Sequence, residues 1–261
     1  MVFGQRILLL IPHPDDEVVG CAAAIGRARA SGGRVYGYVL TDGVPAREIQ
    51  WPWRRGRHAA RVARRRRESE AVADRLGLEI AGREEIPARQ LKENLLPVMI
   101  RLAAAIYRVR PDVIWAPAYE GGHQDHDVTS YIATLLRWRC AVWEFSAYNF
   151  AGGRVRSQSF IAPGTGEQAI ELDAAERREK AELLSLYVSE QGNLGYVETR
   201  REVFRPLADY DYTRPPHSGG CFYQRFQWVP CHPRVDYTTP EQVCAALAAF
   251  RDGAARWAIP G

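Results

Sequence analysis

The sequence lacks long apolar runs, paired cysteine motifs and internal repeats. Its purely aliphatic runs, such as residues 7–11, are no longer than five residues, so we expect no membrane-spanning segment and no membrane partner. The five cysteines are scattered without C-x-x-C spacing, which argues against a disulfide framework and a thiolate zinc site. The first residues show no basic region followed by an apolar core and a cleavage site, so we expect a cytoplasmic protein.

The sequence also has little excess of charge of either sign. The net charge is +4, and much of the excess lies in one arginine-rich block, Arg54–Arg67. A solvated helix face explains this block as well as an anionic ligand does, and we expect no nucleic-acid partner. The chain of 261 residues has 46% apolar and 25% charged residues, which is typical of a globular protein with one substantial core.

Strand and helix patterns alternate along the first 145 residues. The sequence predicts strands at 7–11, 34–40, 78–81, 113–116 and 142–145, and helices at 17–30, 58–76, 94–108 and 126–138. Alternation with short links predicts an α/β fold with a Rossmann-like, mostly parallel sheet flanked by helices.

After residue 146 the pattern weakens. The sequence there predicts helices at 173–187 and from Pro240 to about 250, separated by loops with short strands. We therefore predict a single domain over 1–261, with an α/β core at 1–150 and an irregular C-terminal cap with helices at 151–261.

The run Pro12-His13-Pro14-Asp15-Asp16-Glu17 directly follows the first predicted strand. Carboxylates this close repel one another unless a positive charge lies among them, and a metal ion would supply it. His13 and Asp16 are three residues apart across a strand-to-helix turn, which can place both on one side. An acidic helix N-terminus is the alternative, and Glu17 in particular is more typical of a helix-dipole partner.

A second polar run, Gly121-Gly122-His123-Gln124-Asp125-His126-Asp127, follows the strand predicted at 113–116. Ligands of parallel sheets lie at the carboxyl ends of the strands, where both runs are expected. We assign His13, Asp16 and His126 as metal ligands, because two histidines and one carboxylate with an open position form a catalytic zinc shell. The same donors also suit Fe²⁺ or Co²⁺.

The remaining polar groups suggest the chemistry. Zinc lowers the pKa of a bound water to about 7, and Asp15 could accept its proton as general base. His123 could stabilise the oxyanion and protonate the leaving nitrogen. Asp125 could orient His123 through its ring N–H and raise its pKa, so that the ring is cationic when needed. The reaction class is metal-assisted hydrolysis of an amide.

Both motifs, together with Thr41-Asp42-Gly43 and Arg67-Glu68-Ser69-Glu70, resemble the PIG-L/LmbE-like family of zinc-dependent N-deacetylases. The resemblance covers residues 5–150 and implies the metal and catalytic roles given above. It also implies that Arg67 contacts substrate. The implied activity removes an acetyl group from an N-acetylglucosamine-type amino sugar in a small molecule, glycoconjugate or natural product. The sequence does not indicate an oligomeric state.

The sequence departs from the family pattern at three places. Residues 86–91 contain no Asp where members commonly carry one that grips the sugar, and Gln124 stands where Pro is frequent. The active-site Tyr of some members has no secure counterpart, Tyr119 being the nearest candidate. These departures leave open a non-sugar amide, such as a thiol conjugate, as substrate. A non-catalytic binding protein with the same fold is a further alternative.

Two other segments bear on the substrate. Trp51-Pro52-Trp53 lies in the loop predicted at 41–57, where the indoles could stack on a sugar ring or pack against the protein. In the 211–220 stretch, His217 could reach the pocket and contact substrate, or it could be a structural histidine of the loop.

Overall fold

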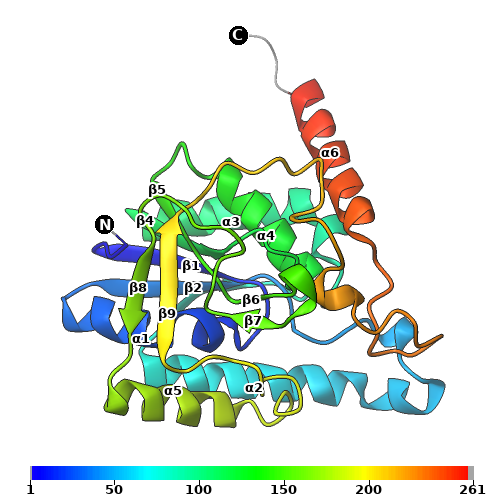
Figure 1. Cartoon of the computed structure of the whole chain (residues 1–261), viewed down its shortest axis with the longest axis horizontal. Coiled ribbons are helices and arrows are strands. Elements are labelled where there is room, and N and C mark those ends of the chain that lie inside the picture. The colour runs from blue at the N-terminus through cyan, green and yellow to red at the C-terminus, as the bar shows by residue number, and fades with distance from the viewer. Residues whose placement is uncertain (1, 258–261) are drawn as a thin grey trace.

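The computed structural model describes residues 2–257 and has a central seven-stranded sheet with helices on both faces (Figure 1). Its strands are β1 (Arg6–Ile11), β2 (Arg34–Val39), β3 (Glu79–Arg83), β4 (Val113–Pro117), β5 (Ala141–Phe145), β8 (Gln168–Glu171) and β9 (Arg201–Pro206), with β6 (Tyr148–Asn149) and β7 (Arg156–Ser157) forming a separate pair. Its helices are α1 (Asp16–Ala30), α2 (His58–Leu76), α3 (Leu95–Val109), α4 (Gln124–Leu135), α5 (Ala174–Leu186) and α6 (Pro240–Trp257).

The strand order is β3-β2-β1-β4-β5-β9-β8, and the first five of these strands are parallel. The apolar run of β1 lies at the middle of the sheet, where alternate side chains enter two different cores. Leu9 packs with α1, α2 and α5 on one face, whereas Leu8 and Leu10 pack with α3, α4 and α6 on the other. Burial of both faces explains why β1 is a continuous apolar run.

The predicted mostly parallel sheet flanked by helices is confirmed, but the sheet extends beyond the residues that the sequence assigned to it. Strand β9 pairs antiparallel with β5, and β8 pairs antiparallel with β9. Thus the segment after residue 150 adds two strands to the central sheet. Residues 207–239 form an irregular cap with a single short 3₁₀ turn at Phe222–Gln224.

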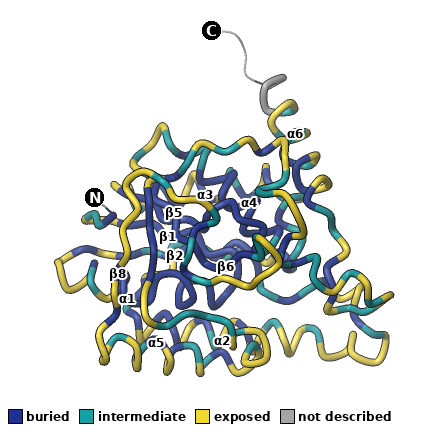
Figure 2. The backbone as a smooth tube through the Cα atoms, viewed as in Figure 1, coloured by how far each residue is buried: buried dark blue, intermediate teal, exposed yellow. Residues whose placement is uncertain are grey.

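The carboxyl ends of β1 and β4 lie beneath two long loops, 40–57 and 207–239, whose residues are mostly exposed or half-buried, while the central strands are buried (Figure 2). The first loop contains 3₁₀ turns at Arg47–Ile49 and Pro52–Arg57. Among the described residues, no helix is long and apolar enough to span a membrane.

Candidate active site

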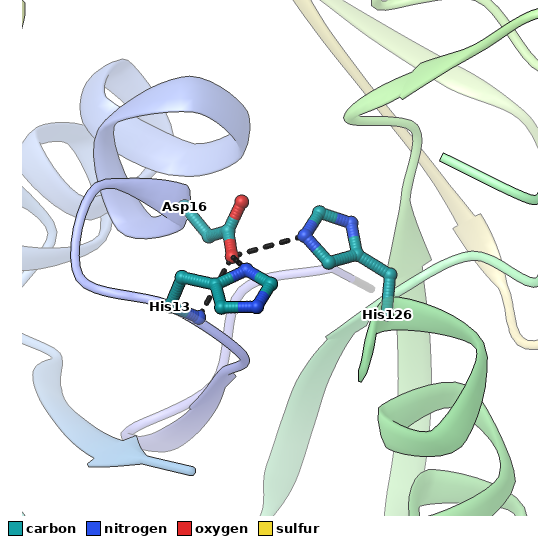
Figure 3. A group of neighbouring side chains, drawn as sticks. All are labelled: His13, Asp16 and His126. Atoms are coloured by element: carbon teal, nitrogen blue, oxygen red, sulfur yellow. Dashed lines mark hydrogen bonds and ion pairs between the residues drawn. The ribbon is translucent and has the colours of Figure 1, made fainter. Parts of the chain in front are cut away.

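Three predicted metal ligands meet at the carboxyl ends of β1 and β4 (Figure 3). His13 stands in the turn between β1 and α1, Asp16 is the first residue of α1, and His126 lies in the first turn of α4. The Oδ2 atom of Asp16 lies 3.2 Å from Nδ1 of His13 and 3.1 Å from Nε2 of His126. All three residues are buried. The fold thus brings together two imidazoles and one carboxylate from segments about 110 residues apart.

The donor atoms of these residues fit a divalent cation. They lie within 4.8 Å of one another, and Nε2 of His126 is buried without a hydrogen-bond partner among the described residues. An imidazole nitrogen that faces a carboxylate oxygen without a hydrogen bond is suited to share a metal with it. Burial lowers the pKa of His13, but contacts with Asp125 and Asp16 outweigh burial and raise it to about 10. The carboxylates thus favour a positive charge at this point.

Asp15 adopts a strained backbone conformation beside the ligands. Its φ of 121° and ψ of −26° lie in a region that a non-glycine residue rarely adopts, at a cost of roughly 1–3 kcal/mol. Glu17 stabilises this conformation. Its carboxylate accepts hydrogen bonds from the backbone N–H of Asp15 at 3.1 Å and from the hydroxyl of Tyr187. Glu17 is buried and thereby supports the turn from which Asp15 and Asp16 project.

The Asp15 carboxyl faces a buried arginine, Arg65 of α2, with 3.1 Å between Oδ2 and Nη2. Arg65 also lies 3.6 Å from Glu190, so its charge is shared between two acids. Burial raises the pKa of Asp15, and the guanidinium of Arg65 opposes that rise. A buried carboxyl beside a fixed positive charge is suited to the role of a general base.

His123 occupies the N-cap position of α4. Its Nδ1 atom accepts the backbone N–H of Asp125 at 3.1 Å, so the proton of the neutral ring lies on Nε2. This differs from the prediction that a ring N–H of His123 donates to Asp125, because the nitrogen nearest the Asp125 carboxylate is this accepting Nδ1. Burial and the charge of His13 also lower the pKa of His123 well below its ordinary value, contrary to the predicted rise.

Asp125 instead contacts the first motif. Its Oδ2 atom lies 3.0 Å from Nε2 of His13 but 3.6 Å from Nδ1 of His123. The same carboxylate accepts the backbone N–H groups of Arg89 at 2.6 Å and Leu91 at 3.3 Å. Asp125 therefore orients His13, and through it the metal ligands, more directly than it orients His123.

The arginine-rich block divides between the site and the surface. Arg65 is buried against Asp15, whereas Arg64 and Arg66 pair with glutamates one helical turn later. Arg67, predicted to contact substrate, is exposed, and the structure does not bring it to the site. The sequence contained a signal for Arg65: it shares one helical face with the buried positions Val72 and Leu76, at spacings of seven and eleven.

The C-terminal cap reaches the second motif. The backbone N–H of Phe222 donates to the carbonyl of Gly121, and Pro216 lies close to the same glycine. His217 is half-buried in this segment, and its Nε2 is buried without a hydrogen-bond partner among the described residues. Within residues 2–257, no hydrogen bond or ion pair joins His217 to the predicted ligands.

Two tyrosines that the sequence did not single out line the site. The ring of Tyr148 lies edge-on to His126 with 5.2 Å between centroids, and Tyr196 lies 5.0 Å from Tyr148. Neither lies in a motif, and both come from irregular segments after β5, so no periodic signal marked them. Tyr119, the nearest candidate from the sequence, instead donates its hydroxyl to the carbonyl of Arg214 at 2.7 Å, inside the second core.

Comparison with known proteins agrees with this geometry. The family model described as PIG-L, GlcNAc-PI de-N-acetylase, matches residues 8–137, which include both motifs. No curated protein sequence matches the chain significantly.

Among solved structures, the A40926 pseudoaglycone deacetylase is 19% identical with a TM-score of 0.61, over 79% of this chain and 99% of that chain. The N,N′-diacetylchitobiose deacetylase of Pyrococcus horikoshii is 18% identical with a TM-score of 0.52, over 78% and 84%. The 4-carboxy-2-hydroxymuconate hydratase of Pseudomonas putida is 17% identical with a TM-score of 0.50, over 79% and 98%. At these identities the likeness establishes a shared fold. Together with the match of the family model, it identifies residues 8–137 of this chain as a PIG-L family domain.

Proposed function

We propose that the protein is a metal-dependent hydrolase that removes an acetyl group from an N-acetylglucosamine-type amino sugar in a small molecule, glycoconjugate or natural product. The observation that carries the proposal is the convergence of His13, Asp16 and His126 beside the strained, buried carboxyl of Asp15. The family domain supports it, as do the activities for which two structural neighbours are named, which are deacetylation of the A40926 pseudoaglycone and of N,N′-diacetylchitobiose.

His13, Asp16 and His126 would hold the metal, which we propose to be Zn²⁺, although Fe²⁺ or Co²⁺ suits the same donors. When bound, zinc would supply a water with a pKa near 7 and polarisation of the amide carbonyl. Asp125 contributes by holding Nε2 of His13 through a 3.0 Å contact, which orients that ring for ligation.

Asp15 carries the proton transfers in this proposal, and His123 stabilises the oxyanion. Asp15 accepts the proton of the attacking water and passes it to the leaving nitrogen, and the charge of Arg65 favours the ionised form of its carboxyl before the transfer. His123 donates a hydrogen bond from its Nε2–H to the developing oxyanion, as a neutral imidazole can. The backbone cap of α4 fixes the ring orientation that this donation needs.

One candidate substrate contact comes from the C-terminal cap. We propose that His217 contacts substrate, because its Nε2 is buried without a protein partner in a segment that packs on Gly121. Arg67 takes no part in this proposal, since it lies on the exposed face of α2.

A second substrate class is favoured by one observation. Residues 86–91 supply no carboxylate that could grip a sugar, and their Arg89 instead donates its backbone N–H to Asp125. An amide without a sugar, such as a thiol conjugate, remains compatible with this wall. Acetate release from a panel of N-acetylglucosaminides and N-acyl thiol conjugates separates the two classes.

The test of the mechanism is Asp15→Ala, with Asp74→Ala on the exposed face of α2 as matched control. We expect Asp15→Ala to keep its metal by elemental analysis and to lose at least ~10²-fold in turnover, since a general base is worth that much. The control should retain both. Hydrolysis at the wild-type rate by Asp15→Ala would contradict the assigned role. Purified protein that holds less than one metal per chain, even after metal is added, would favour a non-catalytic binding protein.

A further inference from the structure

A cavity of about 500 Å³ lies beside the active site and is not used by the mechanism above. Its walls come from three segments that are distant in sequence, namely residues 46–49, 88–93 and 231–242. The cavity therefore lies between the loop after β2, the segment after β3 and the C-terminal cap. A hollow of this size can enclose one ring of a small molecule.

The cavity is joined to the reaction centre through Arg89. The backbone N–H of Arg89 donates to Oδ2 of Asp125, the same oxygen that contacts His13. Its guanidinium crosses to the opposite wall, where it donates to the carbonyls of Arg234 at 2.7 Å and Val235 at 3.0 Å. Arg89 thus fixes the distance between the Asp125 carboxylate and the far wall of the cavity.

Gln124 provides a second, independent anchor. Its amide nitrogen donates to Asp236 at 2.6 Å and to Thr238 at 2.9 Å, and its oxygen accepts the ammonium of Lys92 at 2.7 Å. Gln124 and Asp236 are both buried. Two of the three places where the sequence departs from its family pattern, the 86–91 segment and Gln124, therefore hold the 233–238 wall, so the cavity is a built feature of this chain.

The charged groups that line the cavity are already paired. Lys92 lies 2.8 Å from Glu93, Asp236 accepts from Gln124, and Arg89 is occupied by backbone carbonyls. A charged ligand would have to displace these partners, at a cost in desolvated, unpaired groups. The lining therefore favours an uncharged occupant.

Aromatic side chains stand at the edge of the cavity. Trp51 stacks on Trp53 with 5.1 Å between ring centroids, and its edge meets His232, a lining residue, at 6.0 Å. Trp53 is 72% exposed, and two lining residues, Ile49 and Tyr237, are each 46% exposed. Exposed indoles and apolar side chains provide faces on which a flat or C–H-rich ring can stack.

We infer that this cavity binds an uncharged ring of the substrate, distal to the scissile amide, with Trp51 contributing to the stacking surface. The occupant has an apolar ring face, whether it is a second pyranose or an aromatic aglycone. This inference rests on the proposed amide hydrolysis and specifies its substrate as a molecule of at least two rings.

The experiment compares acetate release from N-acetylglucosamine, N,N′-diacetylchitobiose and phenyl N-acetyl-β-glucosaminide. The wild type should have a kcat/KM about tenfold or more higher for the two-ring probes, which corresponds to a stacking interaction. Trp51→Ala and Ile49→Asp should remove that advantage through KM and leave the one-ring probe within about twofold. Trp138→Ala, which removes an indole that is 83% exposed after α4, is the matched control. The better two-ring probe distinguishes a sugar from an aromatic occupant.

A two-ring advantage that is absent from the wild type, or unchanged in both cavity variants, would overturn the inference while leaving the proposed function in place. If no probe releases acetate, the substrate part of the proposed function fails, and binding alone then tests the cavity. For that purpose intrinsic fluorescence is titrated with phenyl β-glucoside and with N,N′-diacetylchitobiose. Weaker binding in Ile49→Asp than in Trp138→Ala supports the cavity, and equal or no binding in both overturns it.

Discussion

The reaction centre and the neighbouring rim of loops are held in different ways. At the centre, His13 and Asp16, and likewise His123 and His126, are linked by backbone hydrogen bonds within one turn, each at the carboxyl end of a buried strand. The rim is held by side chains that reach far along the chain, as Arg89 does to the carbonyl of Arg234. Each of the two motifs of the centre is thus built locally, whereas the rim depends on long-range contacts.

This difference teaches that the chemistry and the substrate are specified by separate parts of the molecule. The shared fold alone does not determine the reaction, since one structural neighbour is named as a hydratase and others as deacetylases. Changes at the centre should therefore alter turnover, and changes at the rim should alter substrate affinity. The predictions below test that separation, beginning with the largest expected effect.

At the centre, Arg65→Met should lower kcat about 10- to 100-fold at neutral pH. Removing the guanidinium leaves the Asp15 carboxylate buried beside fewer positive charges, so the pKa of Asp15 rises and less of the base is ionised. The acid limb of the kcat profile should move to higher pH. The measurement is kcat as a function of pH with a saturating amide substrate.

Arg67→Met is the matched control, because Arg67 lies two residues away on the exposed face of the same helix. We expect its kcat, KM and pH profile to stay close to those of the wild type. A larger effect from Arg67 than from Arg65 would reverse the assignment of the helix face and restore the interpretation implied by the family resemblance.

At the rim, Arg89→Met should raise KM about tenfold and change kcat less than about twofold. The substitution removes the hydrogen bonds from the guanidinium to the 233–235 backbone, each worth roughly 1 kcal/mol. It keeps the backbone N–H that Asp125 accepts, so the centre stays intact. Steady-state kinetics on a two-ring substrate give the measurement. A loss confined to kcat would show that rim and centre are not separable.

The same separation explains what the sequence could predict. The parallel sheet and the meeting of His13, Asp16 and His126 follow from local signals: apolar strands, short links, and polar motifs at strand ends. The sequence did not predict β8 and β9 as part of the sheet. Both pair antiparallel, outside the strand-helix alternation, and β9 pairs with β5 across some 60 residues of chain. Nothing in their local pattern records that pairing.

Within the site, the electrostatic details were less predictable than the positions. His123 was expected to be cationic because an acid follows two residues later, but the cap of α4 and burial decide its state instead. Arg65 was missed because Arg67 was assigned from the family resemblance, and composition does not distinguish the four consecutive arginines. Only the register of the apolar face of α2 distinguishes the buried one.

The smallest effect concerns stability beneath the second motif, where Glu120 accepts hydrogen bonds from Ser146 and from the backbone of Ile161. Burial raises the pKa of Glu120 to about 8. The folded protein therefore holds a proton that the unfolded chain releases above about pH 4.3. The unfolding free energy should fall as pH rises between about 4.3 and 8, by at most about 1.4 kcal/mol per unit.

Glu120→Gln keeps the shape of the protonated carboxyl and removes its titration, so this part of the pH dependence should disappear. Its stability relative to the wild type should therefore increase with pH up to about 8 and stay constant above it. Denaturant unfolding of both proteins at several pH values measures the difference. Parallel curves would show that Glu120 is ionised in the folded state. The hydrogen bonds from Ser146 and Ile161 would then be made to a carboxylate, and the structure beneath the second motif would not depend on a protonated Glu120.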